Sequence, residues 1–296
     1  MHSFYTQFTD FKATEKHYGT SYYWATKLFP RDIRHATYVL YTWVRVPDEI
    51  VDNSPQEKIE ETRTLLLDYV TKWKEAYEKQ MSDIPVLDAA AKVFHKYNIP
   101  YDVSAKFLQA MISDLHTKRY ETYLDLEDYM AGSAAAVGIM MSYILGFKDG
   151  ALPYARMLGD AMQMTNFLRD VQEDIDERDR IYLPQEDMRL FNITDEHVIN
   201  HNSDALRPLI RDQVEKVRAQ YVESMKGIPM LRRGKLPVAY AAFLYSALLS
   251  KLEEQDYDVF AGRVYTTKRD KLALLWKTLR FMMRKDPAML LSSDQG

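Results

Sequence analysis

Apolar residues recur at every third or fourth position along most of the chain, which is the spacing of one face of an α-helix. Strict alternation of apolar and polar residues, the pattern of a half-buried strand, is scarce. Most prolines stand between the periodic segments and mark their ends. The pattern therefore predicts an all-α protein of roughly ten helices with short connections, forming a bundle around a central cavity.

No low-complexity linker, charge block or short repeat divides the chain, so a single helical domain over residues 1–296 is expected. The formal net charge of −4 offers no basic face and argues against a nucleic-acid partner. The chain has no cysteine, which excludes disulfides, thiolate metal sites and a cysteine nucleophile. The lack of cysteine also suits a cytoplasmic protein.

The chain offers no clear sign of a membrane-spanning or secretory segment. Its first residues lack the apolar stretch of a secretory signal. The longest uncharged stretch, residues 130–147, just reaches the length of a transmembrane helix but contains Gly132, Ser133, Ser142 and Gly146. We interpret this stretch as a buried core helix.

A first acidic motif lies in residues 31–53, which we predict to be helical. Six residues follow alternate spacings of four and three and would share one helix face: Arg34, Tyr38, Tyr41, Arg45, Asp48 and Asp52. Pro47 stands inside the run and should kink or interrupt the helix just before the acids. Acids four residues apart are also common on solvated helix faces, so this pair alone leaves both interpretations open.

A second acidic motif lies in residues 155–184, which we also interpret as one helix. An apolar stripe runs along it: Met157, Ala161, Met164, Leu168, Val171 and Ile175. Beside the stripe stand Gln163, Asn166, Asp170 and Asp174. Burying such groups unpaired is costly, so they need a ligand, water or a metal. A half-exposed helix is the alternative, but an Arg shortly before an Asp-x-x-x-Asp pair occurs twice, which favours function.

Two carboxylate pairs that face each other across a cavity suit Mg²⁺ and a diphosphate. Mg²⁺ is usually held by one or two carboxylates together with substrate phosphates. Arginines add charge-assisted hydrogen bonds to the same phosphate oxygens. A carbocation left behind by the diphosphate needs a dry, aromatic surrounding, and the chain has 21 Tyr and 12 Phe to line one. The alternative interpretation is that these aromatic residues simply pack in the hydrophobic core.

The chain resembles the phytoene synthase and squalene synthase family of head-to-head prenyltransferases over roughly residues 15–275. The resemblance rests on segments 17–30, 45–53, 129–141, 161–174, 180–187 and 257–265, among them RVPDEIVDN and AMQMTNFLRDVQED. It implies the all-α isoprenoid synthase helical bundle around a central apolar cavity. Two segments differ in sequence from many members of the family: the block from Gly132 to Gly138, and the ERD before RIYLP.

The resemblance also implies roles for individual residues. Metal ligands would be Asp48, Asp52, Asn166, Asp170 and Asp174. Diphosphate-binding residues would be Ser21, Tyr22, Arg45, Gln163, Asn166, Arg169 and Arg263. The four aspartates would act in catalysis with the cavity tyrosines Tyr41, Tyr129 and Tyr245. The implied cofactor is Mg²⁺, with Mn²⁺ as the alternative. The lack of a glycine-rich dinucleotide fingerprint favours a redox-neutral product such as phytoene, for which no NADPH is expected.

The amino-acid sequence of both acidic motifs resembles that of prokaryotic phytoene synthases most. This resemblance implies that two molecules of geranylgeranyl diphosphate condense to phytoene via a cyclopropylcarbinyl diphosphate. Synthases of squalene, dehydrosqualene or presqualene diphosphate, acting on farnesyl diphosphate, are the alternatives within the family. A catalytically inactive helical scaffold, a head-to-tail elongator or terpene cyclase, and a plain binding bundle with surface acids are the alternatives outside it. The expected partners are prenyl diphosphates, and peripheral contact with a membrane for delivery stays open.

Overall fold

The computed structural model describes residues 8–52 and 58–284. Within these ranges the chain forms fifteen α-helices and no β-strand, apart from isolated bridges that join Arg119 to Ile181 and Phe147 to Leu231. The all-α prediction is confirmed. The helices outnumber the roughly ten predicted from the sequence because several are short connecting turns of eight residues or fewer. The single domain over residues 1–296 stays a prediction.

The helices are α2 Phe11–Tyr18, α3 Thr20–Thr26, α4 Arg31–Asp52, α5 Ile59–Lys79, α6 Pro85–Lys96, α7 Tyr101–Asp114, α8 Tyr123–Met130, the π-helix η3 Ala131–Ala135, α9 Ala136–Leu145, α10 Leu152–Arg169, α11 Val171–Arg178, α12 Gln185–Leu190, α13 Asp195–Ile199, α14 Ser203–Ser224, the 3₁₀-helix η4 Met225–Met230, α15 Lys235–Glu254 and α16 Lys268–Arg284.

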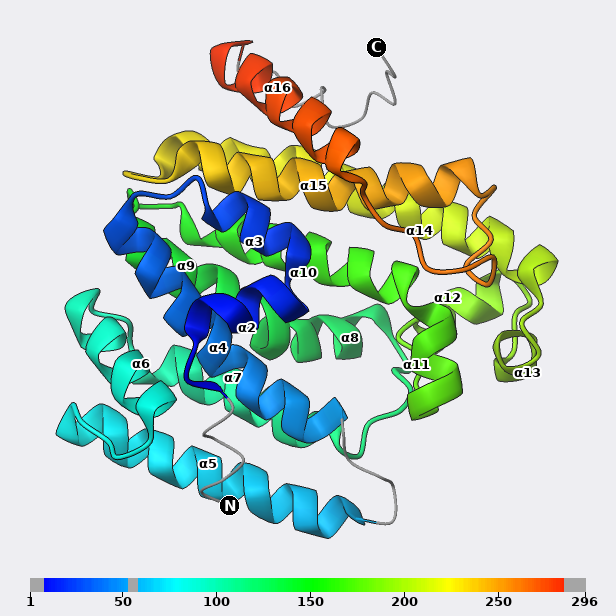
Figure 1. The fold of residues 1–296 in the computed structure, drawn as a ribbon. Coiled ribbons are helices and arrows are strands. Elements are labelled where there is room, and N and C mark those ends of the chain that lie inside the picture. Colours follow the sequence, from blue (N-terminus) through cyan, green and yellow to red (C-terminus); the bar gives the residue numbers. More distant parts are fainter. Residues whose placement is uncertain (1–7, 53–57, 285–296) are drawn as a thin grey trace.

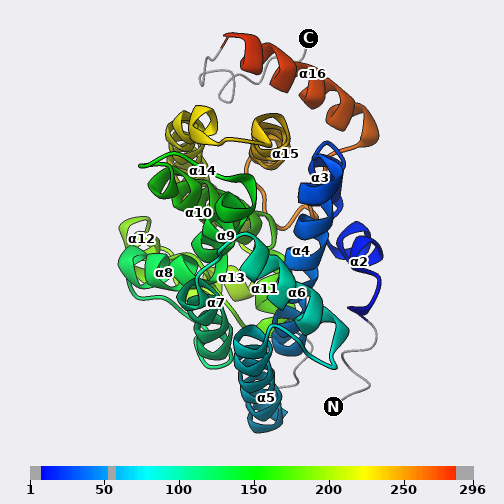
Figure 2. The ribbon, with the colours of Figure 1, turned by 90° about the vertical axis from the view of Figure 1, so that its left-hand side faces the viewer.

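Helix α10 is central to the bundle. It packs against η3 and α9 on one side and against α14 and α15 on another. Figures 1 and 2 show α5 and α6 at one end of the molecule, α14 and α15 toward the other, and α16 outermost beyond α15. Helix α4 crosses the middle and contacts α2, α5, α6 and α7. Helix α4, which carries the first acidic pair, and α10, which leads into the second, are therefore both interior elements.

An aromatic cluster fixes the back of α4. Trp43 on α4 lies against Trp73 of α5, with ring centroids 4.9 Å apart, and against Phe94 and Phe107 at 5.5 Å. Trp73 donates a hydrogen bond of 2.9 Å to Ser104 Oγ, whereas the indole nitrogen of Trp43 is buried without a hydrogen-bond partner among the described residues. Large apolar rings packed at these distances make a rigid support. The opposite face of α4 is thereby held toward the cavity.

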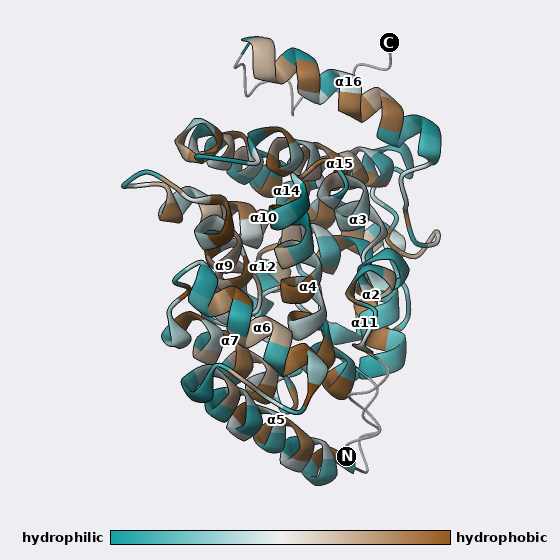
Figure 3. Cartoon of the chain, turned by 60° about the vertical axis from the view of Figure 1, so that its left-hand side comes forward, coloured by the Kyte–Doolittle hydropathy of each residue, from teal (hydrophilic) through white to brown (hydrophobic). Residues whose placement is uncertain are grey.

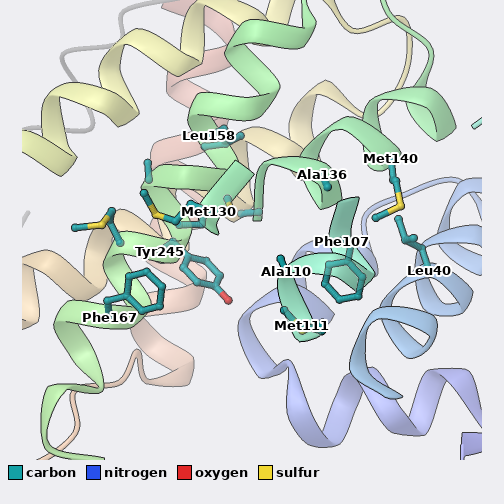
Figure 4. Close-up of a cluster of buried hydrophobic side chains, with 14 of the residues drawn as sticks. Leu40, Phe107, Ala110, Met111, Met130, Ala136, Met140, Leu158, Phe167 and Tyr245 are labelled. Carbon is teal, nitrogen blue, oxygen red and sulfur yellow. The ribbon is translucent and has the colours of Figure 1, made fainter. Parts of the chain in front are cut away.

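Close packing of backbones sets the distance between α9 and α10. A Cβ atom added at Gly138 would lie 2.5 Å from the carbonyl oxygen of Ala155. A Cβ at Gly159 would lie 2.8 Å from the carbonyl oxygen of Ala134, in η3. The small residues of the segment from Gly132 to Gly138 thus let the two helices meet. Figure 4 shows Phe167 and Tyr245 on one side of the interior and Phe107 and Met111 on the other.

Three sequence predictions about helix boundaries need comment. The expected single helix over residues 155–184 is wrong, because the chain turns at Asp170 (φ −106°, ψ 13°) between α10 and α11. Pro47 does not interrupt α4, which continues to Asp52, while residue 53 lies outside the described residues. Residues 130–145 are helical and none of them is exposed, which agrees with a core helix, while Gly146 and Phe147 lie beyond the end of α9. No helix among the described residues is long and apolar enough to cross a membrane.

We predict that Gly138→Ala destabilises the protein, because its new methyl group would meet a backbone oxygen that cannot rotate away. Overpacking of this kind costs about 1–3 kcal/mol, so the melting temperature should fall by about 3 °C or more. Differential scanning calorimetry measures the change. Ser142→Ala, one turn further along α9, is the matched control, and an equal fall in both variants would mean that α9 can shift freely.

Candidate active site

A cavity of about 940 Å³ runs through the bundle. Much of its wall is apolar, formed by side chains of α4, α7, α9, α10 and α15: Leu40, Val44, Met111, Val137, Met141, Leu145, Leu158, Met162 and Leu248. All fourteen residues that the resemblance assigned to the site line this one cavity: Ser21, Tyr22, Tyr41, Arg45, Asp48, Asp52, Tyr129, Gln163, Asn166, Arg169, Asp170, Asp174, Tyr245 and Arg263. The central cavity is therefore present, and it has a charged region beside an apolar one.

The first acidic pair occupies the last turns of α4. Arg45 pairs with Asp48 and Glu49, and its guanidinium lies 3.9 Å from Asp52. Although 37% of the Asp48 side chain is exposed within the cavity, the surrounding protein and the neighbouring Asp52 raise the pKa of Asp48 to about 7. Burial also raises the pKa of Asp52. One arginine therefore does not neutralise this group of acids.

Only part of the predicted face of α4 reaches the cavity. Tyr41, Arg45, Asp48 and Asp52 line it, whereas the two residues at the helix start are covered by α3 and the loop after it. There Arg34 donates to the carbonyl oxygen of Lys27 at 3.2 Å, and the ring of Tyr38 stacks on that of Tyr23. The six residues share one face of the continuous helix α4, as predicted, and the acidic half of that face lines the cavity while its first turns do not.

The second acidic pair flanks the turn between α10 and α11. Asp170 is held by two arginines: Arg169 donates to it at 2.7 and 2.5 Å, and Arg263 Nε lies 2.9 Å from its Oδ1. Asp174 begins the next helical turn, where burial and the nearby Asp170 raise its pKa to about 8. The turn at Asp170 thus lets one carboxylate bind arginine while the other stays short of positive charge.

Two arginines that the sequence analysis did not assign pair with the acids of the site: Arg178 bridges the two motifs, and Arg180 joins the first motif to Asp114. Arg178 Nε lies 3.5 Å from Asp52 and its Nη1 lies 3.4 Å from Asp174. Arg180 Nη1 lies 4.0 Å from Asp52 and 3.1 Å from Asp114. Arg178 stands four residues after Asp174 on the same helix, a spacing that could have indicated it. Arg180 lies in the RIYLP segment that contributed to the resemblance.

Asp114 is a further buried carboxylate that the sequence analysis missed. It ends α7, accepts a hydrogen bond from Tyr182 at 3.3 Å, and has its pKa raised to about 6 by burial. No motif or spacing near Asp114 distinguishes it from the many other acids in the chain. Only the packing of α7 beside the acidic region brings it into the site.

The oxygen atoms of the site suit a hard cation that is shared with a ligand. Asn166 Oδ1 is buried and has no hydrogen-bond partner, so it is free to accept a cation or a donor. No set of three or more His, Cys, Asp or Glu side chains within residues 8–52 and 58–284 is arranged to hold a metal alone. Paired carboxylates fit Mg²⁺, which keeps waters and phosphate oxygens in its coordination sphere. The residues therefore fit Mg²⁺ bound together with a diphosphate.

Aromatic rings stand between the charged region and the apolar wall. Tyr22 lies between Tyr41 and Tyr245, with ring centroids 6.3 and 4.8 Å away. On another side, Phe167 stacks on Tyr182 at 3.9 Å and lies 6.4 Å from Tyr129. Burial raises the phenol pKa of Tyr41, Tyr129 and Tyr245, so these rings stay neutral. Neutral rings with exposed π faces can stabilise a cation without trapping it as a covalent product.

The model of the squalene/phytoene synthase family matches residues 15–270. The chain belongs to this family. It is 33% identical over 276 residues to a 15-cis-phytoene synthase of Synechocystis sp., covering 87% of this chain and 80% of the relative. It is 31% identical to a phytoene synthase of Arthrospira platensis, covering 87% of each.

Solved structures of the squalene/phytoene synthase family agree with the fold. A dehydrosqualene synthase in complex with a ligand superposes with a TM-score of 0.82 at 26% identity, over 95% of this chain and 98% of that one. A squalene synthase from Alicyclobacillus acidocaldarius gives a TM-score of 0.75 at 22% identity, over 87% and 94% of the chains, and shows the fold alone. The predicted family and the isoprenoid synthase bundle are confirmed, and the chain is a prenyltransferase by family.

We predict that Asp174→Asn raises the melting temperature of the metal-free protein at pH 8 by about 3 °C or more, and by less at pH 5. The folded protein holds the pKa of Asp174 near 8, above its ordinary value of 3.8. Between these values the folded state binds more protons than the unfolded state, so this carboxyl lowers stability increasingly as pH rises. Thermal melts in EDTA at both pH values test this.

Asp170→Asn is the matched control, because Asp170 already has two arginine partners. Removing its charge takes the carboxylate partner from Arg169 and one of the two from Arg263, which keeps Glu173, and should give no gain in stability at pH 8. If both variants lower the melting temperature at pH 8, the acids are structural and the interpretation of Asp174 is wrong.

Proposed function

We propose that the chain is a phytoene synthase, which condenses two molecules of geranylgeranyl diphosphate head to head. The observation that carries the proposal is the arrangement of two acid–arginine motifs, bridged by Arg178, at the charged region of a cavity of about 940 Å³ with an apolar wall. The relatives named phytoene synthases support the C20 substrate, since they are 31–33% identical over 87% of this chain. Prenyl diphosphates are thus the proposed partners.

In this proposal Asp48, Asp52, Asn166, Asp170 and Asp174 hold Mg²⁺, with Mn²⁺ as a similar oxygen-binding alternative. When bound, the metal supplies positive charge that favours departure of the diphosphate. The raised pKa of Asp48 and of Asp174, and the free oxygen of Asn166, support these ligands, since each group lacks a sufficient partner.

The arginines bind the diphosphate oxygens. Arg45, Arg169 and Arg263 were expected in this role, and the structure adds Arg178 and Arg180 to the candidates because both face the same acids. Each guanidinium offers paired donors that match phosphate oxygens. Ser21 and Gln163, which line the cavity with Tyr22, complete the proposed diphosphate-binding set.

The apolar wall holds the two prenyl chains side by side and keeps water away from the reacting carbons. The C–O bond of one substrate breaks, and its allylic cation accepts the electron pair of a double bond in the second. Two new C–C bonds and loss of a proton give a cyclopropylcarbinyl diphosphate. Its own ionisation, rearrangement and proton loss yield the hydrocarbon. Tyr41, Tyr129 and Tyr245 present neutral ring faces to these cations.

No reductant takes part in this route, so NADPH is not required for the proposed product. The protein would act in the cytoplasm at the surface of a membrane, which supplies the lipid-like substrate and accepts the hydrocarbon. A second candidate is condensation of two farnesyl diphosphates, favoured by the TM-score of 0.82 with a dehydrosqualene synthase at 26% identity.

We predict that the purified protein with Mg²⁺ converts geranylgeranyl diphosphate to a C40 hydrocarbon without NADPH, and releases diphosphate. Gas chromatography with mass spectrometry identifies the product, and farnesyl diphosphate is offered in a parallel reaction. A C30 product from farnesyl diphosphate alone would replace the proposed substrate by the second candidate. Linear elongated products on addition of isopentenyl diphosphate, or no consumption of either substrate, would contradict the head-to-head proposal.

We predict that Asp48→Asn and Asp174→Asn each lower kcat by about 10²–10³-fold, because each removes a charge that the departing diphosphate depends on. EDTA should abolish turnover, and added Mg²⁺ should restore it. Asp204→Asn is the control, since the Asp204 side chain is 88% exposed and pairs with Arg207 at the surface. Unchanged rates in both site variants, with circular dichroism showing intact folding, would rule out the metal-ligand proposal.

A further inference from the structure

Helix α16 (Lys268–Arg284) is the outermost element of the described chain, and only one of its faces is packed. Its contacts are chiefly with α15. Phe281 lies 5.7 Å from Phe243 between ring centroids, and Tyr240 donates a 2.7 Å hydrogen bond to the carbonyl oxygen of Lys271. Figure 2 shows the helix set across the end of the molecule, with its far side turned away from the bundle.

The far side of α16 carries large apolar side chains. Leu272, Trp276 and Met283 are 55%, 68% and 77% exposed. Their spacings of four and seven place them within one stripe of the helix. Tyr265, just before the helix, is 73% exposed. Four of the eleven large apolar side chains exposed in the described residues therefore gather in this short segment, and such gathering marks an interaction surface.

The same helix is strongly basic in a chain whose net charge is −4. It contains one acid, Asp270, and six cations: Lys268, Arg269, Lys271, Lys277, Arg280 and Arg284. Arg269, Arg280 and Arg284 are exposed, and none forms an ion pair among the residues that the structure describes. Hydrophilic and hydrophobic residues alternate along α16 (Figure 3), and a helix with cations on one side and large apolar side chains on another suits a membrane interface.

The apolar stripe begins at the rim of the cavity. Val264, Tyr265 and Thr266 line the cavity immediately before α16, and Lys271 lines it from the first turns of the helix. A ligand surface that binds the far side of α16 would therefore lie close to residues that line the cavity. This position suits a source of prenyl chains better than a peptide partner, which would have no need of the cavity.

We propose that α16, together with Tyr265, docks the protein on an anionic lipid bilayer. Leu272, Trp276 and Met283 enter the boundary between headgroups and acyl chains, and Arg269, Arg280 and Arg284 contact lipid phosphates. Tryptophan is the side chain most suited to this boundary, since it is apolar with one polar edge. The docked rim exchanges prenyl chains with the bilayer, and this last step rests on the proposed function.

Sedimentation of the full-length protein with vesicles tests the docking surface. We expect binding to vesicles of phosphatidylcholine mixed with phosphatidylglycerol, and at least tenfold weaker binding to phosphatidylcholine alone or at high salt. Trp276→Glu should weaken binding to the mixed vesicles at least tenfold, because it puts a negative charge at the centre of the stripe. Replacing Arg269, Arg280 and Arg284 together by Gln should weaken it similarly.

Leu190→Glu is the matched control, since Leu190 on α12 is 77% exposed and lies far from α16. Tryptophan fluorescence gives a second readout: the wild type should shift to the blue on mixed vesicles, and Trp276→Phe should not. No binding to mixed vesicles, or equal binding by Trp276→Glu, would overturn the proposal. A dimer that Trp276→Glu dissociates, without vesicle binding, would instead make this face a contact between copies.

The docking proposal and the proposed function fail in different ways. In detergent-dispersed substrate, Trp276→Glu should turn over at the wild-type rate, because residue 276 lies outside the cavity. Loss of vesicle binding with full turnover in detergent supports the docking surface. Wild-type protein that binds vesicles but consumes no prenyl diphosphate in detergent would contradict the proposed function and leave the docking surface standing.

Discussion

Carboxylates buried next to one another beside an apolar cavity are the constraint on which the rest of the structure depends. Asp48 and Asp52 on α4 face Asp174 on α11, and Asp114 lies close by. Arginines offset the repulsion only in part, because the pKa values of these acids remain raised. The site is therefore electrostatically incomplete without a ligand, and a metal that arrives with a diphosphate supplies charges of both signs.

The scaffold must keep these acids close together although they repel each other. It does so through rigid contacts on the sides of the helices that face away from the acids. Trp43 locks α4 against α5 with a ring-to-ring distance of 4.9 Å to Trp73. On the other side, Gly138 and Gly159 bring η3 and α9 so close to α10 that no side chain fits between the backbones. Since neither support can yield easily, the acids stay facing each other and the space between the supports remains as the cavity.

Sequence periodicity could find what depends on one helix at a time. Asp48 and Asp52 on α4, and Gln163 and Asn166 on α10, lie on cavity-facing sides because a helix repeats every three to four residues. Sequence periodicity could not predict which helices contact each other. Asp114 enters the site only because α7 packs beside α4, and α3 packs on the start of α4, so the first turns of its polar face do not line the cavity. The turn at Asp170 has no proline or glycine beside it to indicate a break.

The segment that joins α15 to α16 links the charged region to the outer surface. Arg263 in this segment binds Asp170, and three residues later Thr266 lines the cavity before α16 begins. Its anchor is thus an ion pair with an acid that the diphosphate and its metal would also engage. The rim of the cavity is therefore positioned by charge as well as by apolar packing. A ligand bound at the acids would contact one end of this short segment, and lipid bound at α16 would contact the other.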